Sequence, residues 1–222
     1  MSNWTFVNEW RRLKRAELLA QRLGMPRAER TRRDKAIAAF ALEQLASFKA
    51  ASIGFYWPFR GEPDLRRLVR SLLDGGAAAS LPVVIDKGRP LEFWSWRTGD
   101  RLRPGVWDIP VPARRKVARP EVLLVPLLGF DDAGYRLGNG GGYYDRTLAA
   151  MTPRPFTIGV GYELGRMKSI RPQPHDIPMD GIVTEAGAML FPKQPDTARP
   201  AERRPRRASA TARRPLAQEA VS

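Results

Sequence analysis

Residues 122–151 have the sequence VLLVPLLGFDDAGYRLGNGGGYYDRTLAAM, and this stretch decides the fold. Its first seven residues are apolar and include β-branched valines, which predicts a buried strand, and its last five predict a short helix. Three consecutive glycines, Gly140 to Gly142, lie between the two. Glycines at a strand-to-helix junction let a ligand approach the backbone, and the N–H groups and helix N-terminus there favour an anion. The stretch therefore predicts a strand–loop–helix unit with a phosphate or nucleotide site.

The charged and aromatic residues around the glycines strengthen this prediction. Arg136 and Arg146 can supply forked donors to phosphate oxygens, and Asp145 can hold a magnesium ion. The alternative is a sharp structural turn with ordinary flanking charges, which a glycine cluster alone would favour. The loop does not match the P-loop, because Tyr143 and Tyr144 stand where that motif has Lys and Ser or Thr, and its glycine spacing also differs from the dinucleotide-binding fingerprint.

Helical and strand patterns alternate along the rest of the chain. Apolar residues at helical spacing predict three helices, marked by Trp10, Leu13, Ala16, Ala20 and Leu23, by Ile37, Phe40, Ala41, Leu45 and Phe48, and by Leu65, Leu68, Val69, Leu72 and Leu73. Short apolar or alternating runs predict further strands at 52–57, 79–85, 91–96, 156–162, 181–184 and 188–191. This alternation predicts an α/β fold, a single three-layer domain with a mostly parallel sheet covered by helices on both faces.

The ends of the predicted strands indicate where a ligand would bind. In such sheets ligands collect at the carboxyl ends of the strands. The glycine loop, the segment Pro58–Glu62 and the pair Gly161-Tyr162 all follow predicted strands. We therefore expect these three segments to meet at one site.

The composition fits one globular domain followed by a basic segment. The chain has 222 residues, of which 43% are hydrophobic, and a formal net charge of +15. We expect the α/β domain to cover residues 1–191. Residues 192–222 contain eight basic and three acidic residues among many Pro and Ala residues, with few large apolar side chains. This composition predicts a disordered basic tail.

Residue types that are rare or missing exclude several kinds of site. The chain has no cysteine, which excludes a disulfide scaffold, a thiolate metal site and a cysteine nucleophile. Its single histidine, His175, cannot build a multi-histidine metal site, and we interpret it as a packed or turn-bonded imidazole rather than a general base. No apolar run is long enough to span a bilayer, and the first residues lack a signal-peptide pattern. We therefore expect a cytoplasmic protein with no membrane partner.

The loop motif resembles the signature of the 5-formyltetrahydrofolate cyclo-ligase family, also called methenyltetrahydrofolate synthetases. In that family the segment Phe-Asp-x-x-Gly-x-Arg-Leu-Gly-x-Gly-x-Gly-Tyr-Tyr-Asp follows a Val-Pro strand, and Phe130 to Asp145 match it residue for residue. The likeness extends from about Trp10 to about Glu185 and implies the same three-layer α/β fold. Supporting matches are Pro58-Phe59-Arg60-Gly61-Glu62, Leu81-Pro82-Val83, Trp107-Asp108-Ile109-Pro110-Val111-Pro112 and His175-Asp176.

The resemblance implies a reaction, a cofactor and two substrates. The reaction is the ATP-dependent ring closure of 5-formyltetrahydrofolate to 5,10-methenyltetrahydrofolate, with release of ADP and phosphate, through a phosphorylated formyl intermediate. The implied cofactor is Mg²⁺, and the implied folate carries one or several glutamates. Such chemistry needs charge neutralisation, positioning and exclusion of water, but no protein nucleophile.

The resemblance also implies the residues that bind ATP and the metal. For ATP they are Arg11, Arg15, Arg136, Leu137, Gly138, Asn139, Gly140, Gly141, Gly142, Tyr143 and Tyr144, and for magnesium they are Asp145 and Asp176. At the first helix the chain departs from the family pattern, because Arg11 replaces a lysine and Lys14 occupies a place that is usually apolar. Either the residue register used for this helix is off by one to three residues or arginine serves as well as lysine. Two structural alternatives stay open: Asp145 caps a helix, or Asp176 is a turn residue between two prolines.

For the folate, the resemblance implies Trp57 and Glu62 together with loop residues that also contact ATP. Glu62 would accept hydrogen bonds from the donor-rich edge of the pterin, and Trp57 would lie beside its ring. The shared loop residues are Asn139, Gly140, Gly141, Gly142 and Tyr143. The alternatives are that Glu62 is an exposed loop carboxylate and Trp57 a core aromatic. Trp107 is either a pocket wall or simple packing.

Two other functions stay open. The positive charge and the aromatic residues suit a nucleic-acid-binding protein, but the basic residues concentrate in the tail and on two helix faces, and the sequence has no recognised nucleic-acid-binding motif. The second is a cyclo-ligase-like paralogue without catalysis, against which the retained Glu62, Arg136, Tyr143, Asp145 and Asp176 argue. We expect a monomer that binds no specific nucleic acid.

Overall fold

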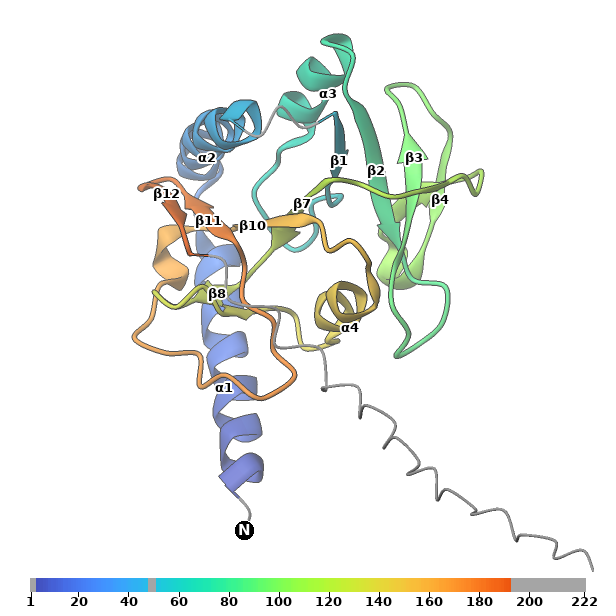
Figure 1. Cartoon of the computed structure of the whole chain (residues 1–222). Coiled ribbons are helices and arrows are strands. Elements are labelled where there is room, and N and C mark those ends of the chain that lie inside the picture. The colour runs from blue at the N-terminus through green and yellow to red at the C-terminus, as the bar shows by residue number, and fades with distance from the viewer. Residues whose placement is uncertain (1–2, 48–50, 193–222) are drawn as a thin grey trace, which may run out of the picture.

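The computed structural model describes residues 3–47 and 51–192. The apolar run at the start of the quoted stretch forms a central strand of an eight-stranded sheet (Figure 1). The strands of this sheet are β1 (Ser52–Gly54), β2 (Ala78–Val83), β3 (Glu92–Trp96), β6 (Val117–Ala118), β7 (Val122–Pro126), β10 (Phe156–Val160), β11 (Gly181–Thr184) and β12 (Gly187–Leu190). Each strand predicted from the sequence is therefore present, with bounds that agree with the prediction or differ from it by one to three residues.

The sheet is mostly parallel, as the alternating pattern predicts. The strands lie in the order β12-β11-β10-β7-β1-β2-β3-β6. The five strands from β11 to β2 in this order pair in parallel. Antiparallel pairing joins β12 to β11, β3 to β2 and β6 to β3. The core of the sheet is thus parallel, and antiparallel strands extend it at both edges.

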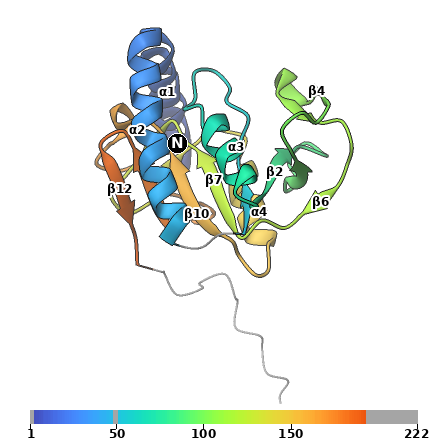
Figure 2. The same cartoon turned by 90° about the horizontal axis from the view of Figure 1, so that it is seen from above.

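Helices cover both faces of the sheet (Figure 2). The α-helices in the described part of the chain are α1 (Asn3–Gly24), α2 (Arg27–Ser47), α3 (Arg66–Asp74) and α4 (Tyr143–Ala150). Successive side chains of a strand point to opposite faces. Leu124 of β7 accordingly packs in one core cluster with residues of α2 and α3, whereas its neighbours Leu123 and Val125 pack in a second cluster with Leu148 of α4. The predicted three-layer fold is confirmed.

The first helix is present and ends at the predicted glycine, but the apolar side chains that predict it do not face the core. Leu13 and Leu23 are 54% and 52% exposed, and Ala16 and Ala20 are exposed as well. The face that packs against the domain instead carries Arg11, Leu18 and Arg22, which are 5%, 4% and 2% exposed. The helix therefore turns a partly basic face inward.

The chain reaches the glycine loop by a longer path than a simple strand–loop–helix unit. After β7 it forms the small hairpin β8 (Gly129–Phe130) and β9 (Arg136–Leu137), and only then the glycines and α4. A second hairpin, β4 (Leu102–Pro104) and β5 (Pro110–Pro112), encloses the 3-10 turn η1 (Val106–Asp108), and another 3-10 turn, η2 (Glu163–Gly165), follows β10. These short elements carry no clear periodicity, which is why the sequence did not predict them.

Two predictions fall partly outside the described residues: Phe48, assigned to the second helix, and the basic tail from residue 193 onward. Within residues 3–47 and 51–192, every helix is too short or too polar to cross a membrane.

Candidate active site

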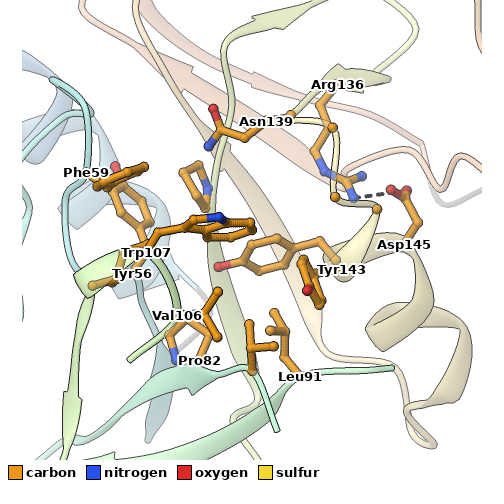
Figure 3. Close-up of a pocket in the computed structure, with 18 of the residues that line it drawn as sticks. Tyr56, Phe59, Pro82, Leu91, Val106, Trp107, Arg136, Asn139, Tyr143 and Asp145 are labelled. Carbon is orange, nitrogen blue, oxygen red and sulfur yellow. Dashed lines mark ion pairs between the residues drawn. The ribbon is translucent and has the colours of Figure 1, made fainter. Parts of the chain in front are cut away.

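A cavity of about 590 Å³ lies at the carboxyl ends of the central strands (Figure 3). Tyr56 and Trp57 follow β1, Pro82 lies near the end of β2 and Pro126 ends β7, and all four line the cavity. This is the edge at which parallel α/β sheets bind ligands. The volume suits a small organic ligand, since such sites span about 300–1,000 Å³.

The glycine loop, residues 138–142, forms one wall of the cavity. Gly140 and Gly142 have φ values of 96° and 61°, a left-handed region that glycine adopts without strain. Gly142 directly precedes α4. Arg15 of α1 reaches the loop and donates from Nε to the carbonyl oxygen of Gly138 at 2.9 Å. The wall thus combines a helix N-terminus with a cationic side chain, and both attract phosphate.

Arg136 and Asp145 form an ion pair beside this loop, drawn as a dashed line in Figure 3. Nη2 of Arg136 lies 2.9 Å from Oδ1 of Asp145, and the same oxygen accepts the Ile177 N–H at 3.1 Å. Arg136 also donates from Nη1 to the Ile177 carbonyl at 2.8 Å. Asp145 lies in the first turn of α4, whose cap residue is Gly142. The alternative that Asp145 caps the helix is therefore wrong.

A second ion pair joins α1 to the segment that follows η2. Nη2 of Arg11 lies 2.5 Å from Oδ2 of Asp176, and Arg11 also donates to the carbonyl oxygens of Ile170 and Arg171 at 3.1 and 2.9 Å. Asp176 accepts the Gln173 N–H at 2.6 Å, so it is a turn residue that also lines the cavity. The turn role and a role at the site are compatible.

Glu62 is a buried carboxylate on the opposite side of the cavity, 5% exposed. Its Oε2 accepts the Phe59 N–H at 3.0 Å, and its Oε1 accepts a hydrogen bond from Nδ2 of Asn139 at 3.2 Å. Burial raises the pKa of the Glu62 carboxyl, and the nearby charge of Arg22 and these two hydrogen bonds oppose that rise. The alternative of an exposed loop carboxylate is wrong. Because Asn139 belongs to the glycine loop, its hydrogen bond ties the two sides of the cavity together.

Aromatic side chains form the apolar part of the cavity. Trp107 is 55% exposed, has a left-handed φ of 57°, and meets the Tyr143 ring edge-on at a centroid distance of 6.0 Å. Figure 3 shows Trp107 between Tyr143 on one side and Tyr56 and Phe59 on the other. Trp57 is half-buried and serves in both predicted ways, because it packs against the core and also lines the cavity. Burial raises the pKa of the Tyr56 hydroxyl, so Tyr56 stays neutral.

Comparison with known proteins identifies the family. The family model for the 5-formyltetrahydrofolate cyclo-ligase family matches residues 7–185. The chain belongs to this cyclo-ligase family. It is 31% identical over 182 residues to the 5-formyltetrahydrofolate cyclo-ligase of Mycolicibacterium smegmatis, which covers 77% of this chain and 91% of that protein. It is 26% identical over 176 residues to the enzyme of the same name from Haemophilus influenzae, covering 76% of this chain and 94% of that one.

Two solved structures share the fold of this chain. The 5,10-methenyltetrahydrofolate synthetase of Aquifex aeolicus aligns with a TM-score of 0.72 and 26% identity, covering 87% of this chain and 99% of that chain. The synthetase of Mycoplasma pneumoniae aligns with a TM-score of 0.66 and 23% identity, covering 79% of this chain and 98% of that chain. At 23% identity, this second likeness supports the fold alone.

The cyclo-ligase cavity brings together nearly all of the residues that the family resemblance implies. Those that line it are Arg11, Arg15, Trp57, Glu62, Arg136, Gly138, Asn139, Gly140, Gly141, Gly142, Tyr143, Tyr144, Asp145 and Asp176. Leu137 is the exception, because it is fully buried in a core cluster with Leu18, Leu128 and Ile170. The position of Arg11 and Arg15 on the cavity wall agrees with the residue register chosen for α1.

One further expectation about this site is wrong. Gly161-Tyr162 does not line the cavity; the Tyr162 hydroxyl instead donates to Asp34 of α2 at 2.6 Å. His175 lies in a turn and is exposed at the cavity, so of its two predicted roles only the packed imidazole is wrong.

Sequence reasoning missed several residues of the cyclo-ligase site. Tyr56, Pro82, Leu91 and Val106 complete the apolar wall, together with Phe59 of the expected segment Pro58–Glu62. Tyr56 and Pro82 lie near a strand end, which is the signal that could have identified them. Leu91 and Val106 come from loops that meet the cavity only through tertiary structure.

Proposed function

We propose that this cavity catalyses the ATP- and Mg²⁺-dependent cyclisation of 5-formyltetrahydrofolate to 5,10-methenyltetrahydrofolate, with release of ADP and phosphate. The observation that carries the proposal is the convergence of an anion-binding wall and a carboxylate-bearing aromatic wall on one cavity. A triphosphate suits the first wall and a flat, hydrogen-bond-donating pterin suits the second. The family assignment supports the same reaction.

We assign the triphosphate to the glycine-loop side. Arg15 and Arg136 lie beside the loop. Arg11 pairs with Asp176, and both line the same cavity. Residues 138–142 and the start of α4 offer a backbone that accommodates phosphate without side-chain hindrance. The three guanidinium groups would neutralise the charge that develops on the transferred phosphoryl group. Leu137 would act on ATP through its backbone, which leads into the glycine loop, since its side chain is buried in the core.

We assign Mg²⁺ to Asp145 and Asp176. Within residues 3–47 and 51–192, no three His, Asp or Glu side chains group to hold a metal ion. Two carboxylates on one cavity still fit Mg²⁺, which is commonly bound by one or two carboxylates together with substrate phosphates and water. Mg²⁺ would supply charge neutralisation on the phosphates. Each carboxylate is paired with an arginine, so Arg11 and Arg136 also orient the two carboxylates.

We assign the pterin to the side that carries Glu62. An ionised carboxylate matches the ring N–H and amino donors of a pterin, and each Glu62 oxygen keeps a further acceptor direction beyond its one protein hydrogen bond. Trp57, Trp107 and Tyr143 provide flat apolar surfaces for the ring. Asn139 to Tyr143 would contact both substrates, because that segment lies between the two walls.

The chemistry then proceeds without a protein nucleophile. The formyl oxygen attacks the γ-phosphorus, the bond to the β-phosphate oxygen breaks and ADP leaves. The second folate nitrogen attacks the formyl carbon and loses its proton, the bond from that carbon to the phosphorylated oxygen breaks, and phosphate leaves with that proton as the ring closes. The chain's task is to align the two substrates and exclude water, which fits a protein with no cysteine and one histidine.

The geometry favours this enzyme over a nucleic-acid-binding protein. Arg11, Arg15 and Arg136 face a concave cavity that also holds carboxylates, rather than an open basic surface. We further propose that the protein acts as a monomer in the cytoplasm, in line with the sequence. Size-exclusion chromatography tests the monomer, and the exposed Leu13 and Leu23 of α1 mark a surface where a dimer could form.

The direct test is to incubate the protein with 5-formyltetrahydrofolate, ATP and Mg²⁺ and to follow the absorbance of the methenyl product. We expect product only when all three are present. Absence of product from protein that is shown to be folded would overturn the proposal. Tight, salt-sensitive RNA binding by the same protein would favour the nucleic-acid alternative instead.

A further inference from the structure

Arg22 of α1 is a fully buried arginine that the proposed reaction does not yet use. It is 2% exposed, and within the described residues its Nη1 and Nη2 atoms have no hydrogen-bond partner. It is not among the residues that line the cavity. Burial of a cation with unsatisfied donors is costly, so its presence calls for an explanation beyond packing.

Arg22 lies directly beneath the loop that carries Glu62. Its Nε donates to the carbonyl oxygen of Arg60 at 2.9 Å, and its Nη2 lies 3.9 Å from Oε1 of Glu62. A Cβ built on Gly61 would lie 3.6 Å from Cγ of Arg22. One side chain from α1 therefore hydrogen-bonds Arg60, pairs with Glu62 and lies beside Gly61 between them.

The loop needs such support because its backbone is unusual. Arg60 and Gly61 have φ values of 47° and 73°, so two successive residues adopt the left-handed conformation. Glycine tolerates this region, whereas arginine does so at a cost in free energy. The hydrogen bond from Arg22 holds the carbonyl of the strained residue Arg60. That contact favours the conformation in which the Glu62 N–H meets the Phe59 carbonyl, at 3.1 Å, and the Glu62 side chain turns to the cavity.

Arg22 also supplies the positive charge nearest to Glu62. Burial favours the neutral form of the Glu62 carboxyl, and among the groups around it Arg22 opposes that effect most strongly. The other groups that face Glu62 are the Phe59 N–H and Asn139, which donate to it, and the neutral phenols Tyr56 and Tyr144. Loss of the Arg22 charge would therefore raise the pKa of the Glu62 carboxyl further.

We propose that Arg22 is a positioning residue for the folate: through its hydrogen bond to Arg60 and its ion pair with Glu62 it fixes the Phe59–Glu62 loop and holds the Glu62 carboxyl toward the N–H donors of the pterin. This inference rests on the proposed function. Removing one partner of a buried ion pair leaves the other charge uncompensated and is destabilising. Arg22→Met should therefore lower stability. A purely structural role would change the folate and ATP KM values alike, whereas a positioning role should weaken folate binding alone.

The test compares Arg22→Met and Arg22→Lys with the wild-type chain in steady-state cyclisation assays and thermal unfolding. For Arg22→Met we expect a KM for 5-formyltetrahydrofolate raised by about tenfold or more, an ATP KM within about twofold of wild type and a lowered unfolding temperature. Folate binding by this variant should also improve as pH rises, because its Glu62 ionises later. Arg22→Lys keeps the charge but lacks the Nε donor, so it should give an intermediate folate KM.

Arg12→Met is the matched control, because Arg12 lies on the exposed face of the same helix and, among the residues that the structure describes, pairs only with Glu9. It should leave both KM values unchanged. Wild-type folate KM values in Arg22→Met, or equal rises in the folate and ATP KM values, would overturn the inference. If Arg22→Met does not fold, the folate KM of Arg22→Lys decides in the same way. An inactive but folded wild-type protein would instead refute the proposed function, and the inference with it.

Discussion

Gly140→Ala tests whether the left-handed glycine of the loop is required for nucleotide binding. Gly140 has a φ of 96°, and a Cβ there would lie 3.6 Å from Nε of Arg15, so space is adequate and backbone strain is the main effect. Gly138, two residues earlier, is not among the residues with positive φ, and a Cβ there would have no described atom within 4 Å. Gly138→Ala is therefore the control for strain.

The expected size of the effect follows from the backbone geometry. Holding an alanine in the left-handed region costs about 1–2 kcal/mol. In a domain of this size each kcal/mol lowers the unfolding temperature by about 2–4 °C, so Gly140→Ala should unfold about 2–8 °C lower. If the loop relaxes instead, the contact between Arg15 and Gly138 shifts, and a displacement of about 1 Å can reduce turnover by about 100-fold. The strain should therefore appear in stability, in turnover or in both.

Thermal unfolding and steady-state kinetics with varied ATP separate these outcomes. Gly138→Ala should keep the wild-type unfolding temperature within about 2 °C, although its methyl group enters the cavity and can raise the ATP KM. Gly140→Ala should lower the unfolding temperature or the turnover number. If it matches Gly138→Ala in unfolding temperature and wild type in turnover, the loop does not need its left-handed glycine.

Three further changes test other parts of the site. Asp145→Asn keeps an oxygen for the Ile177 N–H but removes the charge beside Arg136, so turnover at limiting Mg²⁺ should fall by at least about 10- to 100-fold; wild-type rates there would exclude a metal role. Glu62→Gln should raise the folate KM but not the ATP KM. Wild-type folate binding should weaken as pH falls through the raised pKa of Glu62, whereas the variant should show no such dependence, and equal pH profiles would contradict a carboxylate contact. A chain ending at Phe191 should keep the unfolding temperature and turnover, because the removed segment has few apolar residues; a large drop in either would place the domain boundary further on.

The parts of the fold that could be predicted are those in which local pattern and burial agree. The apolar run that became β7 is buried on both faces, as expected for a central parallel strand, and the alternating run that became β3 lies nearer the sheet edge. The glycine loop could be predicted because Gly140 and Gly142 do need left-handed conformations. In each case the physical requirement acts on neighbouring residues, so a single sequence contains it.

Contacts between distant residues set the limits of such prediction. Trp107 became part of the cavity because its loop, between β4 and β5, folds across toward Tyr143, and nothing in the local sequence specifies that meeting. The local sequence does not specify the short hairpin of β8 and β9 either. It moves the glycine loop away from the end of β7, and its strands are too short to show periodicity.

Helix α1 shows why a periodic pattern can identify a helix and still misplace its buried face. Its sequence contains two stripes at helical spacing, the apolar one from Trp10 to Leu23 and another formed by Arg11, Arg15, Leu18 and Arg22. Hydrophobicity favours burial of the first stripe, since arginine is seldom buried without a partner. The fold buries the second because its partners come from far along the chain: the carbonyls of residues 170 and 171 and Asp176 for the first arginine, Gly138 for the next, and the loop of Glu62 for the last. The stripe of arginines therefore connects the turn of Asp176, the glycine loop and the loop of Glu62, which are segments assigned to metal, ATP and folate. Burying these arginines costs desolvation free energy, and the stripe is retained because it organises the site.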